Sequence, residues 1–76
     1  MNYLRDTDLL LKFGKRVKKI RLEKGLTQKE LALQMDVEIS QISRIERGLV
    51  NPTLTTLIKL AACLHVKAAH FFGERL

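Results

Sequence analysis

The sequence predicts an all-α, compact five-helix domain, with helices at about 8–24, 28–35, 39–46, 54–64 and 67–72. Apolar residues recur at spacings of three and four within these segments, and glycines or turn-forming residues separate them. No segment shows the sustained alternation of β-branched residues that is typical of a strand. At 76 residues, 46% of them hydrophobic and 29% charged, the chain is long enough for one globular domain.

The first helix is expected over about 8–24, behind an N-terminal leader of residues 1–8 and within a single domain spanning 9–76. Gly25 provides a left-handed stop after it. Gly14 lies inside this helix and costs about 1 kcal/mol relative to Ala, so we expect a neighbouring helix to approach closely there. Its apolar residues share one face: Leu10, Phe13, Val17 and Ile20.

Two short helices joined by a tight turn are predicted next. Thr27 and Glu30 have the spacing of a capping box, in which each residue's side chain accepts a hydrogen bond from the other's backbone amide. Asp36 tolerates the left-handed conformation that a tight turn needs. Helices over 28–35 and 39–46 therefore have helix-turn-helix geometry. Their inward-facing residues are expected to be Leu31, Ala32, Met35, Ile42 and Ile45.

The last two helices follow a loop over residues 49–53. Thr53 is the predicted N-cap of helix 54–64, and His65-Val66 marks the break before the short helix 67–72, which adds Phe71 and Phe72. The fourth helix is expected to bury Leu54, Leu57, Ile58, Ala61 and Leu64.

Charge is concentrated in one part of the chain. The net charge of the chain is +6. Residues 12–29 alone hold eight basic residues and one acidic residue, a net charge of +7, whereas the charges of residues 30–76 sum to zero. A clustered basic segment favours a polyanionic partner. A solvated helix surface that serves solubility explains the charge equally well. A membrane surface fits less well, because the apolar positions are used by the core.

The remaining composition excludes several classes of function. One cysteine forms no internal disulfide, which indicates a reducing compartment, and we expect a cytoplasmic protein. The apolar run Leu9-Leu10-Leu11 is too short for a signal peptide or a membrane span. We expect no metal and no cofactor, because Cys63, His65 and His70 lack the spacing of zinc frameworks. A core this small leaves little room for a deep cleft, so we expect no enzyme.

Four motifs stand in order along the chain: Phe13-Gly14-Lys15-Arg16-Val17, Gly25-Leu26-Thr27-Gln28-Lys29-Glu30-Leu31-Ala32, Ile42-Ser43-Arg44-Ile45-Glu46-Arg47-Gly48 and Asn51-Pro52-Thr53. Over about residues 13–72 this set resembles the phage-repressor-like (Xre/Cro) helix-turn-helix DNA-binding family. The resemblance implies a five-helix fold and binding to operator DNA, usually as a dimer. Asp36 and His65 stand at turns where the family often has glycine.

One face of the third helix is small, polar and basic, opposite Ile42 and Ile45. Arg44 on this face has the geometry for a bidentate contact to guanine, and Ile39 offers apolar surface to a thymine methyl group. The Ser40 hydroxyl group can donate or accept a hydrogen bond, and Gln41 flanks the face. The predicted base-reading residues are Ile39, Ser40, Gln41 and Arg44.

A second set of residues is predicted to hold the DNA backbone. Gln28 opens the second helix, where free amides and the helix dipole favour a phosphate, and the resemblance also implies a backbone contact there. Arg47 and Asn51 match family positions that often touch phosphates, and Ser43 is assigned to the same group. The resemblance further implies a partly buried salt bridge between Arg21 and Glu46, with a structural role.

These observations predict a sequence-specific, double-stranded DNA-binding transcriptional regulator. We expect a homodimeric repressor or controller that acts at a palindromic operator. The alternative is an antitoxin-type or other protein-interaction module, in which the helix-turn-helix is mainly a scaffold for a protein partner. Restriction–modification controllers, antitoxins and small phage-type repressors all include free-standing relatives of this size, and the sequence does not separate them.

Overall fold

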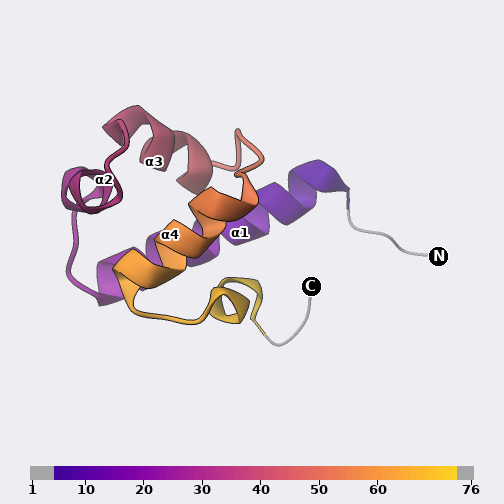
Figure 1. Cartoon of the computed structure of the whole chain (residues 1–76). Helices are drawn as coiled ribbons and strands as arrows, with labels where there is room; N and C mark the ends of the chain where they lie inside the picture. Colours follow the sequence, from indigo (N-terminus) through magenta and orange to yellow (C-terminus); the bar gives the residue numbers. More distant parts are fainter. Residues whose placement is uncertain (1–4, 74–76) are drawn as a thin grey trace.

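The structure, a computed structural model, describes residues 5–73. It contains α1 (Asp6–Glu23), α2 (Gln28–Met35), α3 (Ile39–Glu46), α4 (Leu54–Leu64) and the 3₁₀ helix η1 (Ala68–Phe72) (Figure 1). No strand occurs in the described part of the chain. The predicted all-α class with a helix-turn-helix is confirmed, although the fifth helix is a 3₁₀ helix.

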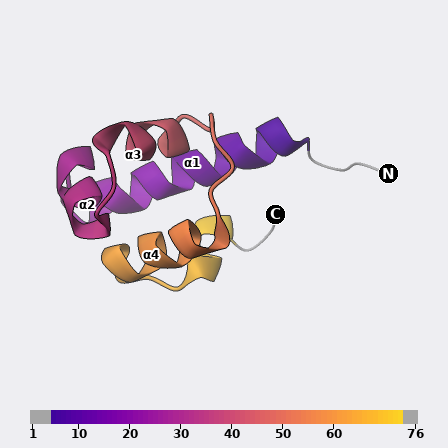
Figure 2. The ribbon, with the colours of Figure 1, turned by 45° about the horizontal axis from the view of Figure 1, so that its top comes forward.

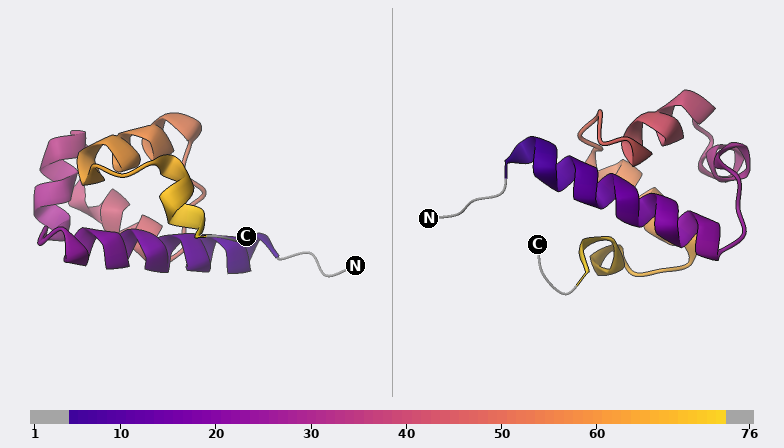
Figure 3. Two further views of the ribbon diagram at one scale, coloured as in Figure 1. Left: turned by 90° about the horizontal axis from the view of Figure 1, so that it is seen from below. Right: turned by 180° about the vertical axis from the view of Figure 1, so that it is seen from behind.

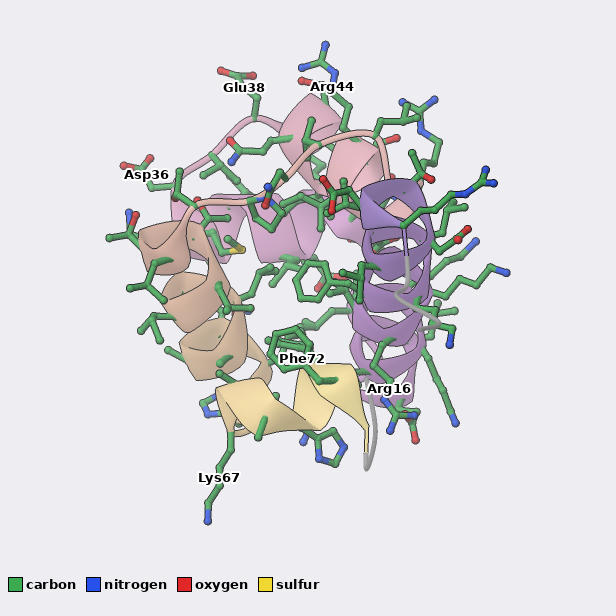
Figure 4. All side chains as sticks on the ribbon, turned by 90° about the vertical axis from the view of Figure 1, so that its right-hand side faces the viewer. Arg16, Asp36, Glu38, Arg44, Lys67 and Phe72 are labelled. Carbon is green, nitrogen blue, oxygen red and sulfur yellow. The ribbon has the colours of Figure 1, made fainter. Side chains whose placement is uncertain are left out.

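The helices enclose one core around the long helix α1. α3 packs along α1, and α2 packs against both α3 and α4 (Figure 2). η1 returns from the end of α4 to α1 (Figure 3). Seen nearly along α1, α3 lies above the core, α4 and α1 lie on either side, and η1 closes it from below (Figure 4). This arrangement leaves one side of α3 uncovered.

α1 begins two residues earlier than predicted. Asp6 and Asp8 lie in its first turn, where negative charge is favourable beside the positive end of the helix dipole. Residues 6–8, which were expected in the leader, therefore belong to the helix. At the other end Gly25 has φ +73°, as expected for a left-handed stop.

Two turns use left-handed residues other than glycine. Asp36 after α2 and His65 after α4 both have φ 57°. Asp and His are enriched several-fold in this conformation among non-glycine residues, so both turns form in spite of the missing glycine. Thr53 accepts a hydrogen bond from the Thr56 amide and caps α4, as predicted.

The core is mainly apolar and joins α1 to η1. Phe13 contacts Phe71 edge-on at a centroid distance of 5.6 Å and Phe72 nearly parallel at 5.9 Å, so both C-terminal phenylalanines find places beside it. The buried apolar residues are Phe13, Val17, Ile20, Leu31, Ala32, Met35, Ile42, Ile45, Leu60, Ala61, Leu64 and Phe71.

The prediction that Leu54 and Ile58 are buried is wrong. Leu54 is 73% exposed and Ile58 is 54% exposed. They lie one turn apart on α4, at the edge of its apolar surface, and the neighbouring helices cover only the side that carries Leu60 and Leu64. α4 therefore presents an apolar stripe to solvent, which we define as Leu54, Ile58 and the exposed Ala62.

α1 and α3 approach each other closely at Gly14. A Cβ atom at this position would lie 2.6 Å from the carbonyl oxygen of Glu46 and would also collide with that of Ile45. The close contact predicted from the mid-helix glycine is therefore present.

Within residues 5–73, no helix is both long and apolar enough to cross a membrane.

Candidate nucleic-acid interface

The outward side of α3 carries most of the predicted base-reading residues. The helix buries Ile42, Ile45 and Glu46. Arg44 projects from the top of the molecule, away from α1, α4 and η1 (Figure 4). The other predicted residues on this side are Ile39 and Ser40, which are exposed, and Gln41, which is half-buried.

Several of these residues border an open depression of about 330 Å³ between α3 and the loop before α4. Ser40, Gln41 and Arg44 line it from α3, and Asn51 lines it from the loop. The fold thus brings a predicted backbone-contacting residue next to three predicted base-reading residues. It leaves Ile39 outside this depression, on the exposed first turn of α3.

Threonine hydroxyls on the far wall of the depression were not singled out from the sequence. Thr53 and Thr56 both line it, and their Oγ1 atoms lie 3.0 Å apart. No acidic residue occupies the first turn of α4. Hydroxyls at an acid-free helix start are suited to phosphate oxygens. The run Thr53-Leu54-Thr55-Thr56 is the signal that could have indicated them.

A buried carboxylate ties α3 to α1 and α2. Glu46 receives Arg21 Nε at 2.6 Å on Oε2 and Arg21 Nη2 at 3.0 Å on Oε1. Arg21 also donates Nη1 to the Leu26 carbonyl at 2.7 Å. The side chains of Arg21 and Glu46 are only 7% and 2% exposed. The pair that the resemblance implied is thus present and shielded from water.

Gln28 joins the same carboxylate from the start of α2. Its Nε2 donates to Glu46 Oε1 at 3.0 Å, and the residue is half-buried. The side-chain amide is therefore already engaged inside the protein. Gln28 still offers to a phosphate its backbone amide, one of the free donors in the first turn of α2, and the second N–H of Nε2.

The capping box holds the first turn of α2 in place. The Thr27 amide donates to Glu30 Oε1, and the Glu30 amide donates to Thr27 Oγ1, both at 3.0 Å. Hydrogen bonding of the Glu30 carboxylate to the Thr27 backbone amide, and next to the Thr27 side chain, holds the pKa of Glu30 below its ordinary value of 4.5. The box uses the amides of Thr27 and Glu30 and leaves those of Gln28 and Lys29 to outside acceptors.

The other predicted backbone-contacting residues flank α3. Arg47, at the C-terminal cap, is exposed, and its Nε donates to the Ser43 carbonyl at 3.4 Å. Ser43 itself is half-buried, and Asn51 is exposed in the loop. The structure places all of them near the uncovered side of α3, but it contains no DNA, so their contacts stay predictions.

A second, larger cavity lies elsewhere. A mainly apolar groove of about 570 Å³ runs between the N-terminal half of α1 and η1. Leu9, Leu10 and Phe72 line it, and none of the predicted base-reading residues does. We therefore assign the interface to α3, where exposed polar and basic groups converge.

Among residues 5–73 no group of three His, Cys, Asp or Glu residues lies close enough to hold a metal ion.

The chain matches known proteins over most of its length. A family model described as helix-turn-helix matches residues 17–71. The immunity repressor protein of Bacillus phage phi105 is 39% identical over 61 residues, which cover 80% of this chain and 42% of that protein. This chain thus spans less than half of the phage repressor.

Two solved structures of restriction–modification controllers are similar in fold. The controller C.AhdI from Aeromonas hydrophila has a TM-score of 0.81 at 36% identity, covering 83% of this chain and 96% of that one. The controller C.Esp1396I, solved as a tetramer with its natural 35 base-pair operator, has a TM-score of 0.76 at 42% identity and covers 84% of each chain.

Proposed function

The chain belongs to the helix-turn-helix family, and on that premise we propose that it is a sequence-specific, double-stranded DNA-binding transcriptional regulator. It acts as a homodimeric repressor or controller at a palindromic operator. The observation that carries this proposal is the uncovered side of α3, where Arg44 projects outward while Ile42 and Ile45 anchor the helix in the core.

The relatives support the same class of function. C.Esp1396I binds its operator as an oligomer, and its chain is matched over 84% of its length. The near-complete overlap with C.AhdI supports a controller of this kind. The phage repressor is matched over only 42% of its length, so its activity as a whole protein is carried over only as a proposal.

In this proposal α3 enters the major groove, which is wide enough for a helix. Arg44 reads a guanine by two hydrogen bonds, and Ile39, Ser40 and Gln41 contact neighbouring base edges. Around it, Ser43, Arg47 and Asn51 hold phosphates and fix the register of the helix without reading sequence. Gln28 contributes its backbone amide and the second N–H of Nε2, while the first N–H holds Glu46.

The homodimer forms through the apolar stripe of α4. Leu54 and Ile58 are large aliphatic side chains in water, and burying each against a second copy contributes roughly 1.5 kcal/mol or more. A two-fold interface places two copies of α3 about 34 Å apart, or a multiple of that, on successive turns of the duplex. Dimerisation thus gives the protein the same two-fold symmetry as a palindromic operator.

The protein works in the cytoplasm, without a cofactor or a catalytic reaction. Binding at a promoter is enough to block it, so repression needs no surface beyond the DNA interface. A single cysteine, partly buried as Cys63, fits a reducing compartment.

Operator selection from random duplexes tests the proposal. The selected sequences are expected to be palindromic, and a dimer that neutralises six to eight phosphates should give a log–log salt slope of about −6 in fluorescence anisotropy. No enriched sequence, or a slope near zero, would reject the DNA-binding function.

Arg44→Ala and Arg47→Ala then separate base reading from backbone binding. Arg44→Ala is expected to remove about 1–3 kcal/mol of discrimination against the wrong base. Arg47→Ala should weaken binding to selected and scrambled duplexes by the same factor and reduce the salt slope by about 0.9 per copy. If Arg44→Ala leaves binding and function intact, the helix-turn-helix is instead a scaffold for a protein partner.

A further inference from the structure

One side of α1 is basic and packs against nothing in the described part of the chain. α3 and the turn that follows it approach α1 at Leu11, Gly14 and Arg21, while η1 approaches it at Phe13 and Arg16. At 100° per residue these contacts leave the opposite side of the helix open. Three exposed lysines lie there, and we call them the lysine face: Lys12, Lys15 and Lys19.

The lysine face has the charge spacing of a DNA strand. Its three lysines lie within about 10 Å of helix axis, and the same length of one strand carries about three phosphates. The salt bridge found among residues 5–73 joins Arg21 to Glu46, so none of these lysines is paired with a carboxylate there. Their charge is therefore available to an outside polyanion.

The lysine face does not point in the direction of the base-reading side of α3. In Figure 4, α1 forms one flank of the molecule, whereas Arg44 projects from the top. A straight duplex seated on α3 passes over the top and leaves the flank free. α4, the helix that carries the apolar stripe, forms the flank opposite α1 (Figure 4).

This arrangement has a consequence for a dimer on DNA, and it depends on the proposed function. Two copies joined through their α4 stripes would turn both lysine faces outward, toward the DNA on either side of the operator. That DNA is held beside the lysines by α3, which raises its effective concentration there. Bending toward the protein would bring its phosphates to the lysines, which offset the cost of the bend.

We propose that the lysine face binds the phosphodiester backbone of DNA flanking the operator and bends that DNA toward the protein. The contact is independent of sequence, because lysines meet only phosphates. This contact explains why residues 12–29, with their net charge of +7, lie away from the base-reading residues. The basic residues strengthen binding and bend the DNA, and α3 selects the site.

The test compares two lengths of duplex that carry the selected operator. One is about 18 base pairs long and contains only the two half-sites, and the other adds about 12 base pairs of unrelated sequence at each end. The variant is Lys15→Gln/Lys19→Gln. The matched control is Lys59→Gln/Lys67→Gln, which removes the same charge from exposed sites, with Lys67 pointing away from Arg44 (Figure 4).

On the long duplex, the variant is expected to bind about tenfold more weakly than the wild type, with a salt slope reduced by about 2 per copy. On the short duplex, it should bind within about twofold of the wild type, and the control should stay within that range on both. Energy transfer between dyes at the ends of the long duplex should report a bend that the variant reduces.

An equal loss on both duplexes, or no loss on either, would overturn the flanking contact while leaving the proposed function in place. Failure of the wild type to distinguish the short operator from a scrambled duplex would instead reject the proposed function. All substituted lysines are exposed, so matching circular dichroism melting curves will verify that every variant is folded.

Discussion

Gln28 donates its side-chain amide to Oε1 of Glu46 across 3.0 Å, on the carboxylate that Arg21 holds from the other side. The buried carboxylate of Glu46, at the end of α3, thus connects α3 to α1 and to the start of α2. The bond fixes the orientation of the two helices of the helix-turn-helix relative to each other. It also removes a side-chain donor from the DNA-facing surface.

The first prediction concerns this carboxylate. Glu46→Ala leaves the Arg21 guanidinium buried without its charged partner, so the free energy of unfolding should fall by about 3–5 kcal/mol. Urea unfolding followed by circular dichroism measures the change. Glu23→Ala, at an exposed site on α1, is the control and should change stability by no more than about 0.5 kcal/mol.

Replacement of both partners tests whether the loss comes from the unpaired charge. Arg21→Met/Glu46→Leu should recover much of the stability lost in Glu46→Ala, because well-packed apolar residues often replace a buried ion pair at little cost. If the single variant is as stable as the wild type, the pair does not hold the helices together.

The second prediction concerns Gly14. On an open helix surface, Gly→Ala stabilises by about 1 kcal/mol. Here the added Cβ meets the backbone carbonyls of Ile45 and Glu46, which have no flexible side chain to move aside, so Gly14→Ala should destabilise by about 2 kcal/mol. Thermal and urea unfolding measure it, with the exposed Lys15→Ala as control. Increased stability in Gly14→Ala would contradict the close packing of α1 on α3.

The third prediction concerns the apolar stripe. Ile58→Lys places a charge in the middle of the proposed dimer interface and should raise the dimer dissociation constant on the order of a hundredfold. Sedimentation analysis measures it. Leu33→Lys makes a comparable change at an exposed leucine of α2, outside the stripe, and should leave the dimer intact. A dimer that survives Ile58→Lys uses another surface.

The fourth prediction concerns pH. The bonds from Thr27 lower the pKa of Glu30 in the folded protein, so the ionised carboxylate stabilises the fold above the ordinary pKa of 4.5. That contribution is lost as the pH falls through the lowered folded pKa. The wild type should therefore be more stable than Glu30→Gln at neutral pH, and the difference should shrink below pH 4.5.

Urea midpoints measured from neutral to acidic pH will follow this difference. Thr27→Val removes the accepting hydroxyl of the capping box and should reduce the stability of the fold by about 1 kcal/mol at neutral pH. A difference between the wild type and Glu30→Gln that stays constant across the range would show that the charge of Glu30 has no part in the cap.

Much of the fold follows from local chemistry. The capping box at Thr27 and Glu30, the left-handed turn at Asp36 and the cap at Thr53 all form where the sequence predicted them. These features depend on a few adjacent residues, so the sequence is sufficient to find them. The 3₁₀ form of η1 was not predicted, because apolar spacing in five residues does not distinguish it from an α-helix.

The candidate site also combines features that the sequence predicts with features that only the structure shows. The outward side of α3 follows from the spacing of Ile42 and Ile45, which sets the opposite direction for Arg44. The bond from Gln28 to Glu46 joins residues that are 18 positions apart, and no local pattern indicates it. For Gln28, only the structure shows that its side chain is bonded internally.

By itself the sequence determined that this protein is an all-α, helix-turn-helix domain, and which side of each helix is apolar. Only the tertiary structure decided how much of each apolar side is covered, and in which direction the charged sides point. The physical reason is that helical periodicity depends on 3.6 residues per turn, whereas coverage depends on the width and position of neighbouring helices. Leu54 and Ile58 have the period of core residues and are exposed because no described helix lies over them.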